Sequence, residues 1–447
     1  MASDWRTCTV DQIKADDGRA IAIGPFGSRM KADRYVADGV PVIRGNNISD
    51  TRTLVGDLVF VSDETADELR SCNVFPGDLV FPHRGAIGQV GIVPSDQMSR
   101  YILSSSLMKL TCNQDLVDPL FIFYFFRSQD GRHALLQNAS TVGTPGIGQP
   151  LASLRSISVP VPPLPEQRAI AHILGTLDDK IELNQRMNET LEAKARALFK
   201  SWFVDFDPVR AKAEGRDPGL PKPFADLFPD SFVDSELEEI PKGWETRSLY
   251  ESAEFINGAA FKSEDFCDPI QGLPIVKIAE LKDGISAQTK FSDRVMDPKQ
   301  LIDTGELLYS WSGSPDTSLD AFLWTKGRGL LNQHIFKVVT PTIAEKRFVY
   351  YLLKFLRPTL VEIARNKQTT GLGHVTVADM KRLYVCSPPL KVLLAFDNRV
   401  APLFDRAFKN TIQNQTLAAL RDTLLLKLIS GELRVKDAEG VCERVCA

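Results

Sequence analysis

Histidine, cysteine and carboxylate side chains are the groups in this chain that could perform catalysis or bind a metal ion, and their spacing supports neither. The five histidines show no ligand spacing such as His-Glu-x-x-His, and no acidic triad stands out among the Asp and Glu residues. The histidines are His83, His133, His172, His334 and His374. The seven cysteines are scattered and odd in number, so free thiols are expected. We therefore expect a chain that holds no metal ion and is not itself an enzyme.

Two short motifs resemble cofactor-binding sequences but are incomplete. The stretch at residues 24–28 lacks the Gly-Lys-Ser/Thr ending of a phosphate-binding loop. Ser387-Pro388-Pro389-Leu390 resembles the Asn/Asp/Ser-Pro-Pro-aromatic motif of amino-methyltransferases, but it lacks the aromatic residue and no glycine-rich strand–loop precedes it. Its counterpart at residues 161–164 has no polar residue at all. We therefore expect no bound cofactor and interpret both Pro-Pro-Leu stretches as structural.

One sequence pattern occurs twice in the chain. Gly146-Ile147-Gly148 precedes Pro162-Pro163-Leu164 and a long helical run. Gly371-Leu372-Gly373 precedes Pro388-Pro389-Leu390 and a second such run, so that Pro162 matches Pro388. A tandem duplication makes a two-fold pseudo-symmetric molecule from one polypeptide, which suits the reading of two sites or the holding of two copies of one partner.

The repeat extends upstream, and the spacing between matched segments shrinks gradually along the chain, as expected when loops gain or lose residues on a retained scaffold. The matched segments are Trp5 with Trp244, residues 26–28 with 261–263, 39–43 with 272–276, 77–80 with 305–308, and 107–110 with 335–338. Between these segments the halves differ strongly, for example residues 82–88 against 310–316. The chain is therefore expected to contain two copies of one scaffold with different loops.

Each half is expected to begin with an α/β domain. Short strands bounded by Gly and Pro are predicted at residues 40–44, 78–81 and 90–93, and again at 275–278 and 306–310; buried helices are predicted at 118–127 and 346–356. We place the domains at residues 1–158 and 241–385, the helical regions at 159–240 and 386–435, and a frayed tail at 436–447.

A long helix is predicted after each α/β domain. The first runs from about residue 165, where Pro165-Glu166 suit a helix N-terminus, to 203, and would span roughly 58 Å at about 1.5 Å per residue. The second runs from about residue 391 to 429 and ends at Ser430-Gly431, with a kink expected at Pro402.

A heptad seam can be placed at matching positions of both helices. It comprises Leu177, Ile181, Asn184, Asn188, Leu191, Ala195, Leu198 and Trp202 on the first, and Leu403, Ala407, Asn410, Asn414, Leu417, Arg421, Leu424 and Leu428 on the second. Asparagine occupies the same two seam positions in both helices, and a seam asparagine fixes register and partner at a cost in stability. We expect an antiparallel coiled coil that holds the α/β domains at opposite ends. The alternative is two independent amphipathic helices, each packed on its own domain.

Residues 204–243 are rich in Pro, Asp and Lys and cannot form a continuous helix or a central strand. Five phenylalanines in or next to this stretch need burial, so we expect a linker that wraps over the protein. They are Phe203, Phe206, Phe224, Phe228 and Phe232.

Composition sets broad limits on the class of protein. A chain of 447 residues is expected to form two to four domains. The net charge of −4, from 53 basic and 57 acidic residues, argues weakly against a lone nucleic-acid binder, although local basic loops or basic partners could compensate. No apolar stretch approaches the roughly 20 residues of a membrane span, and the N-terminus lacks a signal peptide, so a cytoplasmic protein is expected.

Three motifs together resemble the specificity subunits of type I restriction–modification systems. They are Pro162-Pro163-Leu164-Pro165-Glu166-Gln167 followed by Ile170 and Leu174, residues 198–209 (LFKSWFVDFDPV), and Ile240-Pro241-Lys242-Gly243-Trp244. The resemblance covers essentially the whole chain. The second half departs from it, because Lys391-Val392-Leu393 stands where Pro165-Glu166-Gln167 stands in the first, which leaves the start of the second helix open.

The resemblance implies two target-recognition domains, each reading one half of a split double-stranded DNA sequence. It also implies a central helical pair that spaces the two domains and docks two methyltransferase subunits, with a motor–nuclease subunit joining this core. S-adenosylmethionine, ATP and Mg²⁺ would belong to the partner subunits only. A helix of roughly 58 Å would place the readers more than one DNA turn, about 34 Å, apart.

Base edges are read by donor and acceptor side chains on loops of a rigid scaffold. The candidates for base contact in the first domain are Arg44, Asn46, Asn47, His83 and Arg84, with Lys31 and Arg34 for phosphate. In the second domain they are Lys277, Ser310, Trp311, Gln333 and His334. The alternative for each is a solvated loop or a turn cap. For Asn46-Asn47 in particular, the alternative is that the two residues shape a turn and contact no base. Thr144, Gly146 and Gly148 are expected to terminate the first domain without contacting DNA.

Two other functions stay open from the sequence. One is a symmetric protein scaffold that holds two partner proteins and never touches DNA, which the apolar loop residues Phe322, Leu323 and Trp324 favour. The other is a fused methyltransferase, which would bind S-adenosylmethionine by itself.

Overall fold

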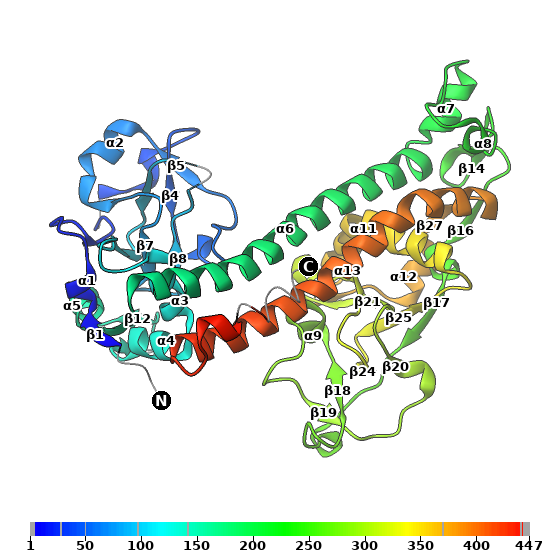
Figure 1. The fold of residues 1–447 in the computed structure, drawn as a ribbon. Coiled ribbons are helices and arrows are strands. Elements are labelled where there is room, and N and C mark those ends of the chain that lie inside the picture. Colours follow the sequence, from blue (N-terminus) through cyan, green and yellow to red (C-terminus); the bar gives the residue numbers. More distant parts are fainter. Residues whose placement is uncertain are drawn as a thin grey trace. The chain divides into compact units, whose positions relative to one another are not determined.

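The computed structural model describes residues 5–26, 29–49, 51–95, 98–140, 143–368, 371–438 and 440. The chain divides into two compact units (Figure 1): Met1–Leu183 with Gln413–Ala447, and Asn184–Ile412. The first unit therefore joins two segments from opposite ends of the sequence. Each unit contains one α/β domain and part of each of two long helices.

A four-stranded antiparallel sheet with one shared strand order lies in each α/β domain. The order is β2-β10-β7-β8 in the first and β17-β25-β21-β23 in the second. The strands are β2 (Ile21–Ile23), β10 (Leu107–Leu110), β7 (Leu79–Pro82) and β8 (Gly91–Ile92), and β17 (Glu254–Asn257), β25 (Ile335–Val339), β21 (Leu307–Ser310) and β23 (Asp320–Leu323). Met108 lies opposite Phe81, and Phe336 lies opposite Tyr309. Both pairs follow the predicted alignment of 77–80 with 305–308 and of 107–110 with 335–338, which is thereby confirmed.

A second sheet in each domain contains one parallel pair. Strand β4 (Val40–Ile43) runs parallel to β9 (Tyr101–Leu103), and β18 (Leu273–Val276) runs parallel to β24 (Gly329–Leu331). The strands that complete these sheets are β3 (Tyr35–Val36), β5 (Val59–Val61) and β6 (Asn73–Val74), and β19 (Phe291–Ser292) and β20 (Leu301–Ile302). Because parallel strands end at the same edge, the loops that follow each parallel pair lie next to each other.

A two-stranded ribbon connects each α/β domain to its long helix. Strand β1 (Arg6–Thr9) pairs with β13 (Ser158–Val161), and β16 (Glu245–Ser248) pairs with β27 (Tyr384–Ser387). Ser387 is buried and accepts a hydrogen bond from the Arg247 guanidinium. The Ser-Pro-Pro-Leu stretch is therefore the connection from strand to helix, as interpreted from the sequence.

The long helices α6 (Leu164–Phe203) and α13 (Leu390–Ile429) pack against each other in opposite directions. In the first unit Asp178 pairs with Arg421 (2.8 Å), and the Asn414 amide donates to the Ile181 carbonyl (3.3 Å). In the second unit the Asn410 amide donates to the Asn188 side-chain oxygen (2.9 Å). Partner numbers fall along α13 as they rise along α6, so the predicted antiparallel pairing of the helices is confirmed.

The seam combines apolar residues with asparagines that bond across the helix pair. The buried members of the predicted pairing set are Leu177, Ile181, Asn184, Asn410, Leu417 and Leu424, and the half-buried members are Asn188, Leu191, Leu198, Leu403 and Asn414. Besides accepting from Asn410, Asn188 donates to the Thr411 hydroxyl (3.2 Å). Such cross-helix bonds are expected of residues that fix register.

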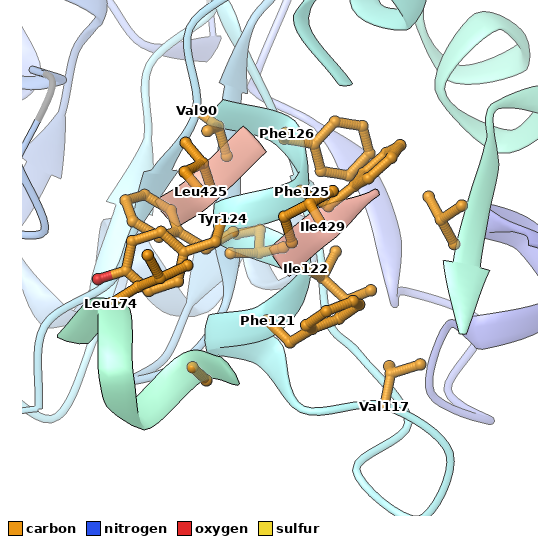
Figure 2. Close-up of a cluster of buried hydrophobic side chains, with 14 of the residues drawn as sticks. Val90, Val117, Phe121, Ile122, Tyr124, Phe125, Phe126, Leu174, Leu425 and Ile429 are labelled. Atoms are coloured by element: carbon orange, nitrogen blue, oxygen red, sulfur yellow. The ribbon is translucent and has the colours of Figure 1, made fainter. Parts of the chain in front are cut away.

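Helix α3 (Pro119–Arg127) lies in the centre of the first unit's core (Figure 2). Its predicted acidic cap is present, since the Asp118 carboxylate accepts from the Leu120 and Phe121 N–H groups at 2.9 and 3.1 Å. The aromatic side chains of α3 pack with Leu174 of α6 and with Leu425 and Ile429 of α13. The counterpart in the second unit, α11 (Ile343–Asn366), is longer than the predicted 346–356 and continues through Pro358.

The linker after α6 folds back onto the second unit. It forms α7 (Asp207–Ala213), α8 (Lys222–Ala225) and a hairpin of β14 (Phe232–Ser235) and β15 (Glu238–Pro241). Phe203, Phe206 and Phe228 are buried, and Phe224 and Phe232 pack against the same core. The five phenylalanines thus pack against the core, as the sequence predicted.

Candidate nucleic-acid interface

Three loops of the first domain meet at the edge where β4, β7 and β9 end. The turn at residues 104–106 joins them. The Ser104 N–H donates to the Ile43 carbonyl at the end of β4, and the His83 N–H donates to the Ser106 carbonyl beyond the end of β7, both at 2.9 Å. The candidates after β4 (Arg44, Asn46 and Asn47) and after β7 (His83 and Arg84), which come from separate sequence segments, are therefore brought to one edge of the domain.

Asn47 is fully buried and shapes the loop that carries Arg44. Its amide donates to the carbonyls of Val55 (2.7 Å) and Asp57 (3.3 Å), and its side-chain oxygen accepts from the Arg44 N–H (3.0 Å). The half-buried Arg44 donates to the Asp57 carbonyl (2.8 Å), while Asn46 is exposed. A base contact by Asn47 is therefore not available in this conformation, and the turn-shaping alternative describes it.

His83 and Arg84 differ in what they present to solvent. The His83 side chain is buried, with Nε2 3.1 Å from the Ser105 carbonyl, so this nitrogen must carry the proton and donate. Burial lowers the pKa of His83, which favours the neutral ring. Arg84 is exposed. Of this pair, Arg84 is the side chain that can reach a base edge.

A glycine-containing loop at residues 143–148 lies beside the His83–Arg84 loop. The Gly85 N–H donates to the Pro145 carbonyl (2.9 Å), and the Ile147 N–H donates to the His83 carbonyl (3.0 Å). Thr144 is exposed at this place. Thr144 and Gly146 therefore border the candidate interface, and the expectation that they make no DNA contact stays a prediction.

The second domain has the same two-loop arrangement. Strand β22 (Ser312–Gly313) pairs with β26 (Gly373–His374), and the Val375 N–H donates to the Trp311 carbonyl (2.9 Å). In the first domain the backbone of Arg84 forms an isolated antiparallel β-bridge with Gly146. In the second domain Ser312 lies opposite His374 in the β22–β26 pair. Backbone pairing thus aligns Arg84 with Ser312 and Gly146 with His374. The sequence match of Gly146-Ile147-Gly148 with Gly371-Leu372-Gly373 was therefore wrong in register.

The second-domain candidates also converge on the edge where β18 and β21 end. The Asn332 N–H donates to the Val276 carbonyl (3.2 Å), which brings the turn before β25 to Lys277. The Trp311 N–H donates to the His334 carbonyl (3.3 Å), and the two rings lie 5.7 Å apart. Gln333 and His334 are exposed, Lys277 and Trp311 are half-buried, and Ser310 is fully buried.

A lysine–carboxylate pair, buried in the first domain and half-buried in the second, anchors the far end of the central strand, and the sequence analysis missed it. Lys109 lies 3.8 Å from Asp78 and donates to the Asn73 carbonyl (2.9 Å). Lys337 lies 2.6 Å from Glu306 and donates to the Leu301 carbonyl (2.8 Å). Burial raises the pKa of Asp78, while the Thr111 hydroxyl and Lys109 favour its ionised form. The alignment of 77–80 with 305–308 and of 107–110 with 335–338 could have revealed the pair.

The phosphate candidates differ in availability. Arg34 forms an ion pair with Glu68 (2.7 Å), whereas Lys31 is exposed and forms no ion pair within the described part of the chain.

Across the described residues no cluster of three or more His, Cys, Asp or Glu side chains could hold a metal ion. None of the helices in those same ranges combines the length and hydropathy that a membrane span requires.

Comparison with protein families decides what this scaffold is. The family model "Type I restriction modification DNA specificity domain" matches residues 27–193 and, a second time, residues 241–421. The chain belongs to this family. The two matches correspond to the two halves of the internal repeat, so the resemblance found in the three sequence motifs is confirmed.

Full-length relatives of this specificity family support the assignment. The MjaIX type I specificity subunit of Methanocaldococcus jannaschii is 27% identical, over 98% of this chain and 95% of its own length. The HindI type I specificity subunit of Haemophilus influenzae is also 27% identical, over 96% of this chain and all of its own. The crystal structure of a type I S subunit from M. genitalium has the same fold, with a TM-score of 0.58 at 14% identity, covering 95% of this chain and 96% of that one.

Proposed function

We propose that this chain is the DNA sequence-recognition subunit of a type I restriction–modification complex, with each α/β domain reading one half of a bipartite site. One observation carries the proposal. The same scaffold occurs twice and presents different polar side chains at the same edge, Arg84 and its neighbours in one domain and His334 and its neighbours in the other. Two scaffolds with different donors and acceptors suit two different half-sites.

Direct base contact is assigned to the candidates that solvent can reach. They are Arg44, Asn46 and Arg84 in the first domain and Lys277, Trp311, Gln333 and His334 in the second. Arginine and lysine suit guanine, and asparagine and glutamine suit adenine. Asn47, His83 and Ser310 are buried and are assigned no direct base contact. Asn47 and His83 are assigned a positioning role, since their side chains hydrogen-bond to the backbone of loops at this edge.

The paired helices are proposed to set the distance between the half-sites and to dock two methyltransferase subunits, with motor–nuclease subunits joining the complex. A net charge of −4 is compatible with DNA binding if partner subunits supply much of the phosphate contact. The chain itself is proposed to be non-catalytic, with S-adenosylmethionine, ATP and Mg²⁺ bound by the partners.

Separate Arg84→Ala and His334→Ala substitutions are each expected to weaken recognition of one half-site only. Losing one base contact should reduce binding to that half by roughly 5- to 150-fold, from about 1–3 kcal/mol per contact. Binding of the co-expressed complex would be measured on duplexes that carry an altered first or second half. Arg19→Ala is the matched control, because Arg19 is exposed at the opposite end of β2 from this edge. An equal loss at both halves would contradict one reader per domain.

The main alternative is a protein scaffold without DNA contact, which the apolar residues Phe322, Leu323 and Trp324 mildly favoured. Trp324 is buried within the second domain, and the Phe322 ring faces the Lys354 ammonium at 5.7 Å. Trp324 is therefore not available to a partner protein, while Phe322 and Leu323 are half-buried. Binding of the reconstituted complex to duplex DNA between 50 and 200 mM salt separates the two functions: a steep, linear fall of log affinity with log salt supports DNA recognition, and no DNA binding at either salt supports the scaffold.

The fused-methyltransferase alternative is tested on the isolated chain. Calorimetric titration with S-adenosylmethionine is expected to give no binding heat. A measurable stoichiometric heat would show that the chain carries its own methyl-donor site.

A further inference from the structure

The loop after β2 carries an aromatic side chain that stands out from the rest of the first domain. Phe26 is 64% exposed, although it lies only two residues from Gly24, which is packed tightly against the domain. The Gly24 N–H donates to the Leu107 carbonyl (2.8 Å). A side chain at Gly24 would place its Cβ 1.8 Å from the Ser104 carbonyl oxygen. The start of the loop is therefore fixed against the turn that also holds His83.

The loop is anchored again four residues after Phe26. Met30 packs against the cluster formed by β4, β5, β9 and α2 (Asp63–Glu68). The Arg29 N–H donates to the Phe26 carbonyl (3.3 Å). An exposed ring between two anchored positions cannot be explained as part of a frayed end.

The surroundings of Phe26 are basic. Arg29 and Lys31 are exposed, and neither forms an ion pair with any described residue. Arg34, by contrast, is neutralised by Glu68. Two free cations beside an exposed ring match a polyanion with apolar faces, which is the chemistry of a DNA strand and not that of an ordinary protein surface.

The second domain has no counterpart of Phe26. Gly24 corresponds to Gly258, since Ile23 pairs with Met108 as Asn257 pairs with Phe336. Met30 corresponds to Phe261, because each precedes the lysine that begins a short helix and each packs on the equivalent cluster of its domain. The sequence match of residues 26–28 with 261–263 was therefore wrong in register. Between these two positions the first domain has three more residues than the second (30 − 24 = 6 against 261 − 258 = 3), and Phe26 belongs to this longer segment. Phe26 has no cation or ring contact within the described ranges of the chain.

We propose that Phe26 is a DNA-contacting wedge that packs into a base step beside the half-site read by the first domain, with Arg29 and Lys31 holding the adjacent phosphates. Apolar side chains inserted between base steps partly unstack them, and basic neighbours fix the backbone on either side. The inference rests on the proposed function, because it extends the same interface from base edges to base stacking.

The test uses the chain co-expressed with its methyltransferase subunits, and short duplexes that carry the methylated motif of the host. 2-Aminopurine replaces each purine in turn across and beside the two half-sites. The wild-type complex is expected to raise 2-aminopurine fluorescence at one step next to the first half-site. Phe26→Ala is expected to abolish that rise and to weaken binding roughly 5- to 100-fold, while Phe26→Trp retains both.

Phe75→Ala is the matched control. Phe75 is 49% exposed and belongs to the same domain, but it lies before β7, at the opposite end of that strand from His83. It is expected to leave both binding and fluorescence unchanged. Arg29→Ala and Lys31→Ala are each expected to lower the slope of log affinity against log salt by about one.

The possible failures are distinguishable. Wild-type affinity and fluorescence in Phe26→Ala would overturn the wedge alone, as would a wild-type complex that binds DNA without a fluorescence change at any position. Loss of co-purifying methyltransferase from Phe26→Ala would overturn it by making the ring a protein contact. A wild-type complex that binds no duplex would overturn the proposed function as well.

Discussion

Replacing Asp178 by alanine is expected to destabilise the first unit by roughly 3–5 kcal/mol, because two buried arginines would lose their shared counter-charge. The Asp178 carboxylate accepts hydrogen bonds from the Tyr124 hydroxyl (2.7 Å), from Arg127 of α3 (3.1 Å) and from Arg421 of α13 (2.8 Å). The side chains of Asp178, Arg127 and Arg421 are only 7%, 10% and 12% exposed. One carboxylate of α6 therefore joins the domain helix α3 to the second long helix.

Thermal unfolding of the purified chain followed by circular dichroism measures this effect. A loss of that size corresponds to a fall in Tm of roughly 6–20 °C for a unit of roughly 200 residues. Asp422→Ala is the control, because Asp422 is the other carboxylate beside Arg421 (2.7 Å) and is 62% exposed. It is expected to cost less than about 1 kcal/mol. Two equally small shifts would mean that the buried network does not stabilise the helix pair.

Truncation of Trp202 to alanine is expected to destabilise the second unit by roughly 3–5 kcal/mol, since it would leave a large cavity in an aromatic core. Trp202 is fully buried near the end of α6. Its ring packs edge-on against Phe228 of the linker, with centroids 4.9 Å apart, and lies 6.1 Å from Phe396 of α13. The side chain therefore holds the linker and both long helices together.

Urea unfolding of the purified variant provides the measurement. Tyr384→Ala removes an aromatic of the same unit that is 42% exposed on β27, and it is expected to change stability by about 0.5 kcal/mol or less. A Trp202→Ala midpoint indistinguishable from that of Tyr384→Ala would refute the central role of this core.

The repeat could be predicted from the sequence because strand order and register changed little between the halves. The matched segments 39–43 with 272–276 and 107–110 with 335–338 are strands that pair in the same way in both domains. The ends of the long helices could also be predicted, since a Pro-Pro-Leu stretch precedes each helix and Ser-Gly follows the second. The length of helix α11 was underestimated. The sequence rule stops a helix near Pro358, but the buried Leu360, Val361 and Ala364 continue its apolar face and outweigh the lost hydrogen bond.

The candidate interface was predicted only in part. The sequence located the loops that carry Arg84 and His334, because polar residues follow one short apolar run at Arg84 and precede another at His334. It could not tell that Asn47 and His83 face inward, since their hydrogen-bond partners are carbonyls 8 to 22 residues away. The alignment of the Gly146 loop with its second-domain counterpart could not be predicted either. Identical glycines matched Gly146 with Gly371, whereas backbone pairing places His374 at the position of Gly146.

The central claim, that the two domains read the two halves of one DNA site, is tested most directly by single-molecule sequencing of the host methylome. Four hosts would be compared, all with the neighbouring genes left in place: one with the gene intact, one with it deleted, one with Arg84→Ala and one with His334→Ala. We predict that deletion removes methylation at one bipartite motif with a fixed gap, and that each variant relaxes the sequence requirement in a different half of it. A bipartite motif that survives deletion, or one that both variants relax in the same half, would contradict the account.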